Sequence, residues 1–160
     1  MKFSILLVVL PFVESAQTLY KLCAIRAGVF CDALSLWQNT NYHDAFWLAD
    51  NGEAAGDTFY FEDTSLVKYD KSKTSKISAH IVTDPTSKDT FILFADSEQH
   101  DISSTPATFK IVDESNGDHH LSVQIKKDVW EIFEKCNGGF MYTTSGLGDC
   151  DSTKIKVESI

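Results

Sequence analysis

The sequence is short of several features that define whole classes of protein. It has 14 lysines and arginines against 23 aspartates and glutamates, a formal net charge of −9, and its basic residues form no cluster along the chain. Nucleic acids and anionic membranes require a concentrated positive face, so neither is an expected partner. Beyond the first residues, no apolar run approaches the length of a membrane-spanning helix, and the alternating end of the chain lacks the apolar tail of a lipid-anchor signal. A membrane anchor is therefore not expected.

Catalytic signatures are also missing. There is no Gly-x-Ser-x-Gly elbow that would carry a serine nucleophile. Acidic pairs such as Glu62-Asp63 fall in turns, where solvation explains them, although two carboxylates brought together by folding would suit a glycosidase. Among the five histidines, the neighbours His119 and His120 point to opposite faces of a strand and do not easily share a metal. We expect a non-enzymatic protein without metal or cofactor.

The chain opens with the layout of a secretory signal peptide. Lys2 precedes a short apolar run, and small residues follow at Ser15 and Ala16. The apolar run is about half as long as a bilayer span requires. We expect residues 1–15 to be a signal peptide, cleaved after Ser15 or Ala16, and residues 16–160 to form a single secreted domain with one hydrophobic core. A buried first strand is the alternative for the opening run.

Four cysteines lie in the expected mature chain: Cys23, Cys31, Cys136 and Cys150. An even number of cysteines in a secreted chain indicates a disulfide framework. Zinc is the competing interpretation, but structural zinc sites usually take ligand pairs two to four residues apart, and these cysteines are spaced more widely. Three pairings are possible. We favour Cys23 with Cys31 and Cys136 with Cys150, because each pair flanks a turn-rich stretch; the alternatives would join the first strand to the last.

Strand patterns dominate the rest of the sequence. About twelve short segments are rich in β-branched or aromatic residues and alternate in polarity. They span residues 19–25, 33–37, 46–48, 58–61, 66–69, 77–82, 90–94, 108–112, 120–125, 129–133, 140–143 and 154–157. Turn-forming pairs such as Asn51-Gly52 and Asn116-Gly117 separate them. Only residues 129–136 are also compatible with one helical turn.

A dozen short strands in one domain favour a closed antiparallel sheet, because closure removes exposed strand edges. We therefore predict an all-β fold, with a closed barrel as the preferred architecture and a β-sandwich as the alternative. Several segments look alike, each with a short apolar strand, a turn and an aromatic-containing partner. A dozen strands in similar groups would suit the three-fold β-trefoil.

Aromatic residues gather in one short stretch of the chain. Four of them fall within eleven positions: Trp37, Tyr42, Phe46 and Trp47. Sugar-binding sites commonly combine flat aromatic faces with polar groups. The polar residues near this stretch are Asn39, Asn41 and Asp50. Large aromatic side chains also build the core of β domains, so both interpretations stay open. Exposed, coplanar Trp37 and Trp47 would indicate a glycan platform, and buried ones a core. We assign Trp130 to the core.

Two stretches carry a recognisable pattern. Residues 20–28 read Tyr-Lys-Leu-Cys-Ala-Ile-Arg-Ala-Gly, and residues 34–37 read Leu-Ser-Leu-Trp. Residues 129–157 contain an aromatic, Cys136, the run Gly-Gly-Phe-Met-Tyr, Cys150 and a closing alternating strand. The first stretch resembles the opening of fungal cell-wall mannoproteins, in which Ile-Arg-x-Gly leads to a second strand ending in an aromatic. The second resembles the cysteine-rich end of wall proteins with internal repeats.

The resemblance implies a secreted structural protein of the fungal cell wall, whose partners are wall polysaccharide or other wall proteins. The chain departs from the family because it has no Ser/Thr-rich stalk, no Gln-containing repeats and no Asn-x-Ser/Thr site. Wall retention would then be non-covalent, through O-linked sugars or through a disulfide, and free secretion stays open. The alternatives are a lectin-like module using Trp37, Tyr42 and Trp47, and a β-trefoil protease inhibitor with residues 84–89 as its reactive segment.

Overall fold

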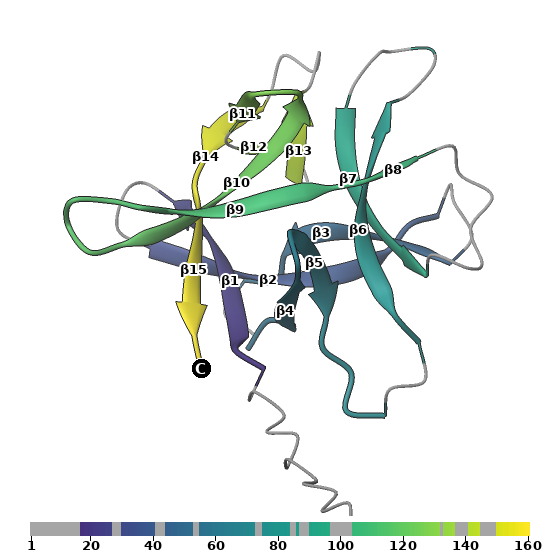
Figure 1. Ribbon diagram of the computed structural model, residues 1–160, viewed down its shortest axis with the longest axis horizontal. Helices are drawn as coiled ribbons and strands as arrows, with labels where there is room; N and C mark the ends of the chain where they lie inside the picture. The colour runs from purple at the N-terminus through teal and green to yellow at the C-terminus, as the bar shows by residue number, and fades with distance from the viewer. Residues whose placement is uncertain are drawn as a thin grey trace, which may run out of the picture.

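The computed structural model describes residues 17–26, 30–40, 44–52, 55–72, 75–83, 86, 90–96, 104–131, 133–136, 141–144 and 150–160. This part of the chain is all-β and contains no helix (Figure 1). Its fifteen strands are β1 (Leu19–Arg26), β2 (Phe30–Gln38), β3 (Ala45–Asp50), β4 (Thr58–Glu62), β5 (Ser65–Lys68), β6 (Ile77–Thr83), β7 (Thr90–Asp96), β8 (Thr105–Pro106), β9 (Thr108–Asp113), β10 (His119–Lys126), β11 (Val129–Glu131), β12 (Phe133–Lys135), β13 (Met141–Thr144), β14 (Asp151–Thr153) and β15 (Ile155–Ser159). The expected signal peptide, residues 1–15, lies outside the described residues.

The strands close on themselves. Seven of them form an antiparallel barrel in the order β1–β2–β3–β7–β6–β5–β4, and β4 returns to β1. The additional strands continue the sheet from the other edge of β1, through β15 to β10 and then to β9. Strand β9 comes back to the barrel, because the Phe109 amide donates a hydrogen bond of 2.9 Å to the Thr64 carbonyl between β4 and β5. The predicted closed all-β barrel is confirmed.

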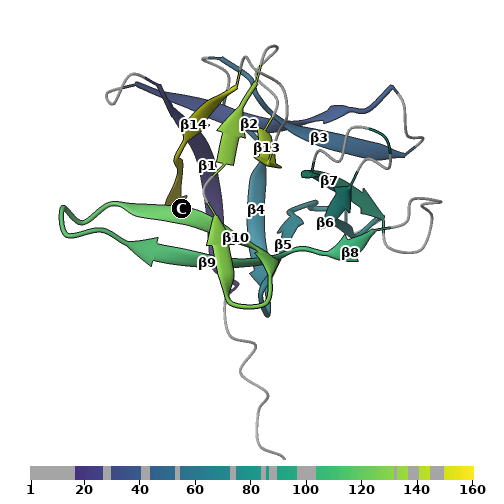
Figure 2. The same cartoon turned by 90° about the horizontal axis from the view of Figure 1, so that it is seen from above.

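The pairings repeat three times along the chain. The units are β1 to β4, β5 to β9 and β10 to β15, and in each unit the first strand lies beside the last. Each unit also sends out a hairpin, formed by β2 and β3, by β6 and β7, and by β12 and β13. The second strands of the three hairpins, β3, β7 and β13, contact one another. Three four-stranded units around one barrel are the arrangement of a β-trefoil, and Figure 2 shows the paired strands β2 and β3 of the first unit side by side.

The predicted segments all coincide with strands. The count rises from about twelve to fifteen partly because β8 and β9, β11 and β12, and β14 and β15 are each separated by a single residue. Joined across these interruptions, the strands number twelve, which is four for each unit. The stretch 129–136, which was also compatible with a helical turn, contains β11 and β12 among its described residues.

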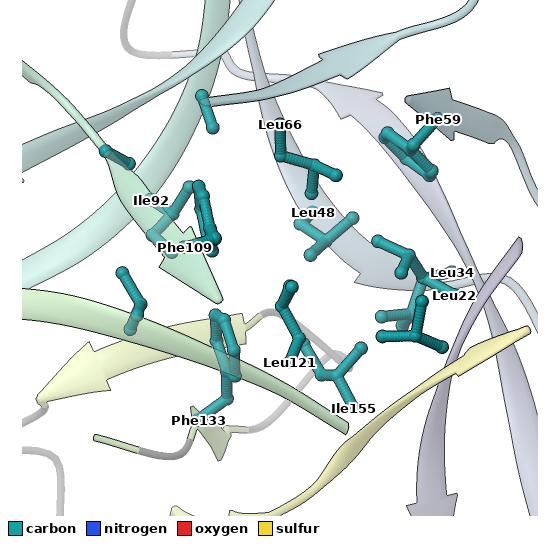
Figure 3. Packing of buried hydrophobic residues seen from close by; sticks show 14 of the residues in the cluster. Leu22, Leu34, Leu48, Phe59, Leu66, Ile92, Phe109, Leu121, Phe133 and Ile155 are labelled. Atoms are coloured by element: carbon teal, nitrogen blue, oxygen red, sulfur yellow. The ribbon is translucent and has the colours of Figure 1, made fainter. Parts of the chain in front are cut away.

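The main core repeats in the same way as the strands. The first strand of each unit contributes a fully buried leucine, and the last strand contributes a large apolar residue (Figure 3). The leucines are Leu22, Leu66 and Leu121, and the second set is Phe59, Phe109 and Ile155. Because successive strand residues face opposite sides, one apolar residue in every two is enough to fill the barrel. This periodicity explains why the units look alike in sequence although few positions are identical.

Both disulfides join neighbouring strands. Cys23 in β1 bonds to Cys31 in β2, with 5.3 Å between their Cα atoms. Cys136 follows β12 and bonds to Cys150, which precedes β14, with 4.1 Å between Cα atoms. The two pairs coincide with the pairing favoured from the sequence. Disulfides of this kind are compatible with an oxidising, extracellular compartment. Among the described residues, no helix is long and apolar enough to cross a membrane.

The connection into β4 is fixed by polar contacts. The Asp57 amide donates to the Leu34 carbonyl (2.9 Å), and its carboxylate accepts a hydrogen bond from the Leu36 amide (2.7 Å). The same carboxylate lies 3.2 Å from the Lys68 ammonium. The preceding Gly56 has a φ of +43°, and a Cβ there would lie 2.8 Å from the Leu34 carbonyl oxygen, so only glycine fits. Asp57 thus joins β2 to β4 and β5.

We expect Asp57→Ala to lower the free energy of unfolding by about 2 kcal/mol, because it leaves the half-buried Leu36 amide without its acceptor. Asp57→Asn keeps an oxygen for that amide and is expected to cost about half as much. Urea unfolding of both variants measures the difference. If Asp57→Asn proves as harmful as Asp57→Ala, the contribution of Asp57 lies in its charge beside Lys68 instead.

Candidate functional site

The two tryptophans of the aromatic stretch lie side by side on one hairpin. Trp37 in β2 is directly opposite Trp47 in β3. Directly opposed residues of an antiparallel pair place their side chains on the same face, with Cβ atoms about 5 Å apart. Trp37 remains 50% exposed, so a large apolar surface on this hairpin faces solvent. The fold therefore presents one tryptophan to solvent beside another.

Trp47 packs against a second, smaller apolar cluster. Its ring centroid lies 4.8 Å from that of Phe91, at an interplanar angle of 43°. The buried members of the cluster come from β3, β6 and β7: Ala45, Val82, Phe91, Leu93 and Ala95. The tryptophan pair is therefore neither fully exposed nor fully buried. Trp47 anchors the face to the domain, and Trp37 extends it to the surface.

Polar groups flank the tryptophan pair on the same face. Ser35 lies two residues before Trp37 in β2, and side chains two residues apart in a strand share a face. The Asn51 side-chain amide donates a hydrogen bond of 3.1 Å to the Ser35 hydroxyl. We define the aromatic face as Trp37, Trp47, Ser35 and Asn51. Sequence analysis missed Ser35 and Asn51, although both continue the alternate positions of their strands.

The polar residues singled out from the sequence have other roles. Asn39 is 3% exposed, and its backbone amide donates to the Ala45 carbonyl (2.8 Å), which closes the β2–β3 turn. Asp50 binds the Lys135 ammonium. Asp50 lies opposite Leu34, on the other face of the hairpin. Asn39 continues the alternate positions of Ser35 and Trp37 but is too buried to offer a binding surface. Tyr42 and Asn41 lie outside the described residues, as does the segment 84–89 apart from Thr86.

Trp130 corrects one expectation. It was assigned to the core, but it belongs to neither apolar cluster and is only half-buried. The Lys110 ammonium lies 4.1 Å from the centroid of its ring. Strand β11 pairs only along β10 among the described strands, so one side of this aromatic ring is covered by a lysine instead of by another apolar layer.

The other candidate groups are engaged in pairs. His119 lies 2.7 Å from the Asp113 carboxylate and His120 lies 3.4 Å from that of Glu114, so the neighbouring histidines have separate partners. Glu62 pairs with Lys76. Within the described part of the chain, no three His, Cys, Asp or Glu side chains gather as a metal site requires.

One cavity of about 270 Å³ lies between β5 and β6, outside the aromatic face. It is lined by Lys68, Tyr69, Asp70, Ser75 and Ile77. Two of its polar side chains already have partners, because Lys68 pairs with Asp57 and the Asp70 carboxylate accepts hydrogen bonds from Ser72. The aromatic face therefore offers the better candidate site.

The chemistry of the aromatic face suits a sugar. An exposed indole presents a flat apolar surface, which matches the C–H face of a pyranose ring, and the adjacent hydroxyl and amide offer hydrogen bonds to sugar hydroxyls. Both strands are rigid elements of the barrel, so the groups are positioned before a ligand binds. Comparisons with protein-family models, with curated proteins and with solved structures found no match.

Proposed function

We propose that this protein is a secreted, non-enzymatic component of the fungal cell wall that binds neutral wall polysaccharide through its aromatic face. The observation that carries the proposal is the half-exposed Trp37 beside the anchored Trp47. The placement in a fungal wall rests on the family resemblance of the two chain ends. The signal-peptide pattern and the two disulfides support an extracellular location.

The proposal has a physical reason beyond the presence of tryptophan. Keeping Trp37 half exposed forgoes part of the roughly 1.5–3 kcal/mol that full burial of a large apolar side chain contributes. A ligand that stacks on the ring recovers this burial. Ser35 and Asn51 then select for a ligand with hydroxyl groups, because a purely apolar partner would leave their hydrogen-bonding groups unsatisfied.

Sedimentation with insoluble β-glucan, chitin and mannan tests the proposal. We expect the mature domain to bind at least one of them, and Trp37→Ala to weaken binding about tenfold or more, as loss of a central aromatic contact usually does. Phe30→Ala is the matched control, since Phe30 lies on the same strand and is 62% exposed, but is not part of the aromatic face. Binding should survive in that variant.

Two results would reject this function. The first is a folded native domain that binds none of the three polysaccharides, because such a domain does not bind wall glycan. Equal loss of binding in Trp37→Ala and Phe30→Ala would place the contact elsewhere. Fractionation of fungal culture tests the location separately, because a wall-associated or released protein must be found in the wall or in the medium.

A further inference from the structure

Most of the described lysines already have polar partners within the protein. Lys21 donates hydrogen bonds to the carbonyls of Ala55 and Gly56. Five others pair with carboxylates: Lys68, Lys76, Lys135, Lys154 and Lys156. This is the expected behaviour of an acidic chain with 23 carboxylate side chains and 14 basic residues. Any lysine left without an acidic partner therefore stands out.

Four described lysines have neither an ion pair nor a hydrogen bond with a described residue: Lys71, Lys110, Lys126 and Lys127. Three of these four lie on one small sheet. Lys110 is in β9, Lys126 ends β10, and Lys127 begins the turn into β11. The three are exposed, and we call them, together with Trp130, the lysine patch. The three lysines do not form a cluster in the sequence. Lys110 comes close to Lys126 and Lys127 only because β9 pairs with β10.

The strand register sets the order of the patch. Along β10, Ser122 is opposite Lys110, Gln124 is opposite Trp130, and Lys126 ends the strand. Ser122 and Gln124 share one face, while Leu121 and Val123 face the core. The register with β11 shifts between Gln124 and Lys126, so this alternation ends before Lys126. At about 3.4 Å per residue, the cationic row from the level of Lys110 to Lys126 extends roughly 13 Å. Trp130 lies in the middle of the row, with the Lys110 ammonium 4.1 Å from its ring centroid.

Like charges held close together repel one another, so the row complements a ligand with spaced negative charges. The acidic residues nearest to Lys126 and Lys127 along the chain are Asp128, in the same turn, and Glu131, at the end of β11. Two carboxylates do not balance the three lysines, so the patch keeps a positive charge. Trp130 and Gln124 add an aromatic edge and an amide between the cations, whereas Ser122 is buried and its hydroxyl donates to the Glu131 carbonyl. A polysaccharide bearing phosphate, sulfate or carboxylate groups offers both kinds of contact. Three cations are too few for the 6–10 phosphate contacts of a tight nucleic-acid complex.

We infer that the β9–β10–β11 sheet is a binding site for an anionic polysaccharide, separate from the aromatic face and independent of it. The chain thus carries two saccharide sites of different chemistry, one on the β2–β3 hairpin for a neutral glycan and one on this sheet for a charged glycan (Figure 1). A net charge of −9 keeps anions away from the rest of the surface, which confines charged glycans to the patch.

Affinity electrophoresis through dextran sulfate, with uncharged dextran as reference, tests this site. We expect the native domain to be retarded by dextran sulfate only, and the retardation to fall as salt screens the contact. Replacing all three patch lysines, by Lys110→Gln, Lys126→Gln and Lys127→Gln, should weaken the interaction at least about tenfold. Because these side chains are exposed, the thermal midpoint should not change, which excludes unfolding as the cause.

Lys71→Gln is the charge-matched control for Lys127→Gln. Lys71 is also exposed and without a described ion pair, but it lies after β5 and outside the patch. The site is overturned if the native domain is not retarded, if the triple variant binds as well as the native domain, or if Lys71→Gln weakens binding as much as Lys127→Gln does. Binding to anionic phosphatidylserine vesicles without binding to dextran sulfate would assign the patch to membranes and also reject the proposal.

Discussion

Phe59→Ala is expected to lower the free energy of unfolding by about 3–5 kcal/mol, a large share of the stability of a domain of this size. Phe59 in β4 is fully buried, and its ring centroid lies 5.7 Å from that of Phe94 in β7. The contact therefore joins two barrel strands, β4 and β7, that are not neighbours in the strand order. Truncation removes the transfer free energy of the ring, leaves a cavity and breaks an aromatic pair, and these losses add.

Trp37→Ala is the natural control for this experiment. It removes an even larger aromatic side chain, but one that is 50% exposed and belongs to neither apolar cluster. We expect it to cost at most about 1 kcal/mol, as for other surface substitutions. Urea unfolding of both variants gives the comparison. A cost for Phe59→Ala no greater than that for Trp37→Ala would contradict the packing of the barrel described above.

The strands were readable from the sequence because their signal is local. Alternation of apolar and polar residues, as in Leu22, Ala24 and their neighbours, is a direct consequence of the two-residue repeat of a strand, and it identified every unit of the barrel. The disulfide pairing was equally local, since each bond joins strands that are close in sequence. The number of strands and their closure followed from the shortness of the segments.

The candidate sites depend on long-range register, which the sequence does not reveal. The positions of Trp37 and Trp47 were visible, but nothing local shows that Phe91, over forty residues later, supports one and leaves the other exposed. Trp130 was misplaced for the same reason, because its aromatic character indicates burial while its position on β11 places it under Lys110. The lysine patch likewise arises only when β9 pairs with β10.

A buried ionic contact links the first and third units of the fold. The Lys135 ammonium in β12 hydrogen-bonds the Asp50 carboxylate in β3 and lies 3.3 Å from that of Asp32 in β2. Asp32 is 8% exposed, so the contact lies largely out of solvent at that end. Burial lowers the pKa of Lys135, but the hydrogen bonds to Asp50 and Asp32 outweigh it and raise the pKa above the ordinary 10.5.

Lys135→Met is expected to lower the free energy of unfolding by about 3 kcal/mol, because it removes the cation and leaves two mostly buried carboxylates beside an apolar chain. Methionine keeps most of the side-chain length, which limits the loss from packing. Lys76→Met is the matched control, since Lys76 and Glu62 are both half exposed, and its cost should stay within about 0.5 kcal/mol. Similar costs for the two variants would show that the inter-unit ion pair has no special role.

The pH dependence of the Lys135→Met effect separates charge from packing. A group whose pKa is raised on folding contributes stability that is fully present below its unfolded value and is lost as the pH rises through its folded value. For Lys135 the stability difference between native and variant should therefore be constant at neutral pH and shrink only above pH 10.5. Urea unfolding across this range measures it. A difference that stays unchanged in strong alkali would mean that Lys135 stabilises the domain by packing against its neighbours and not by its charge.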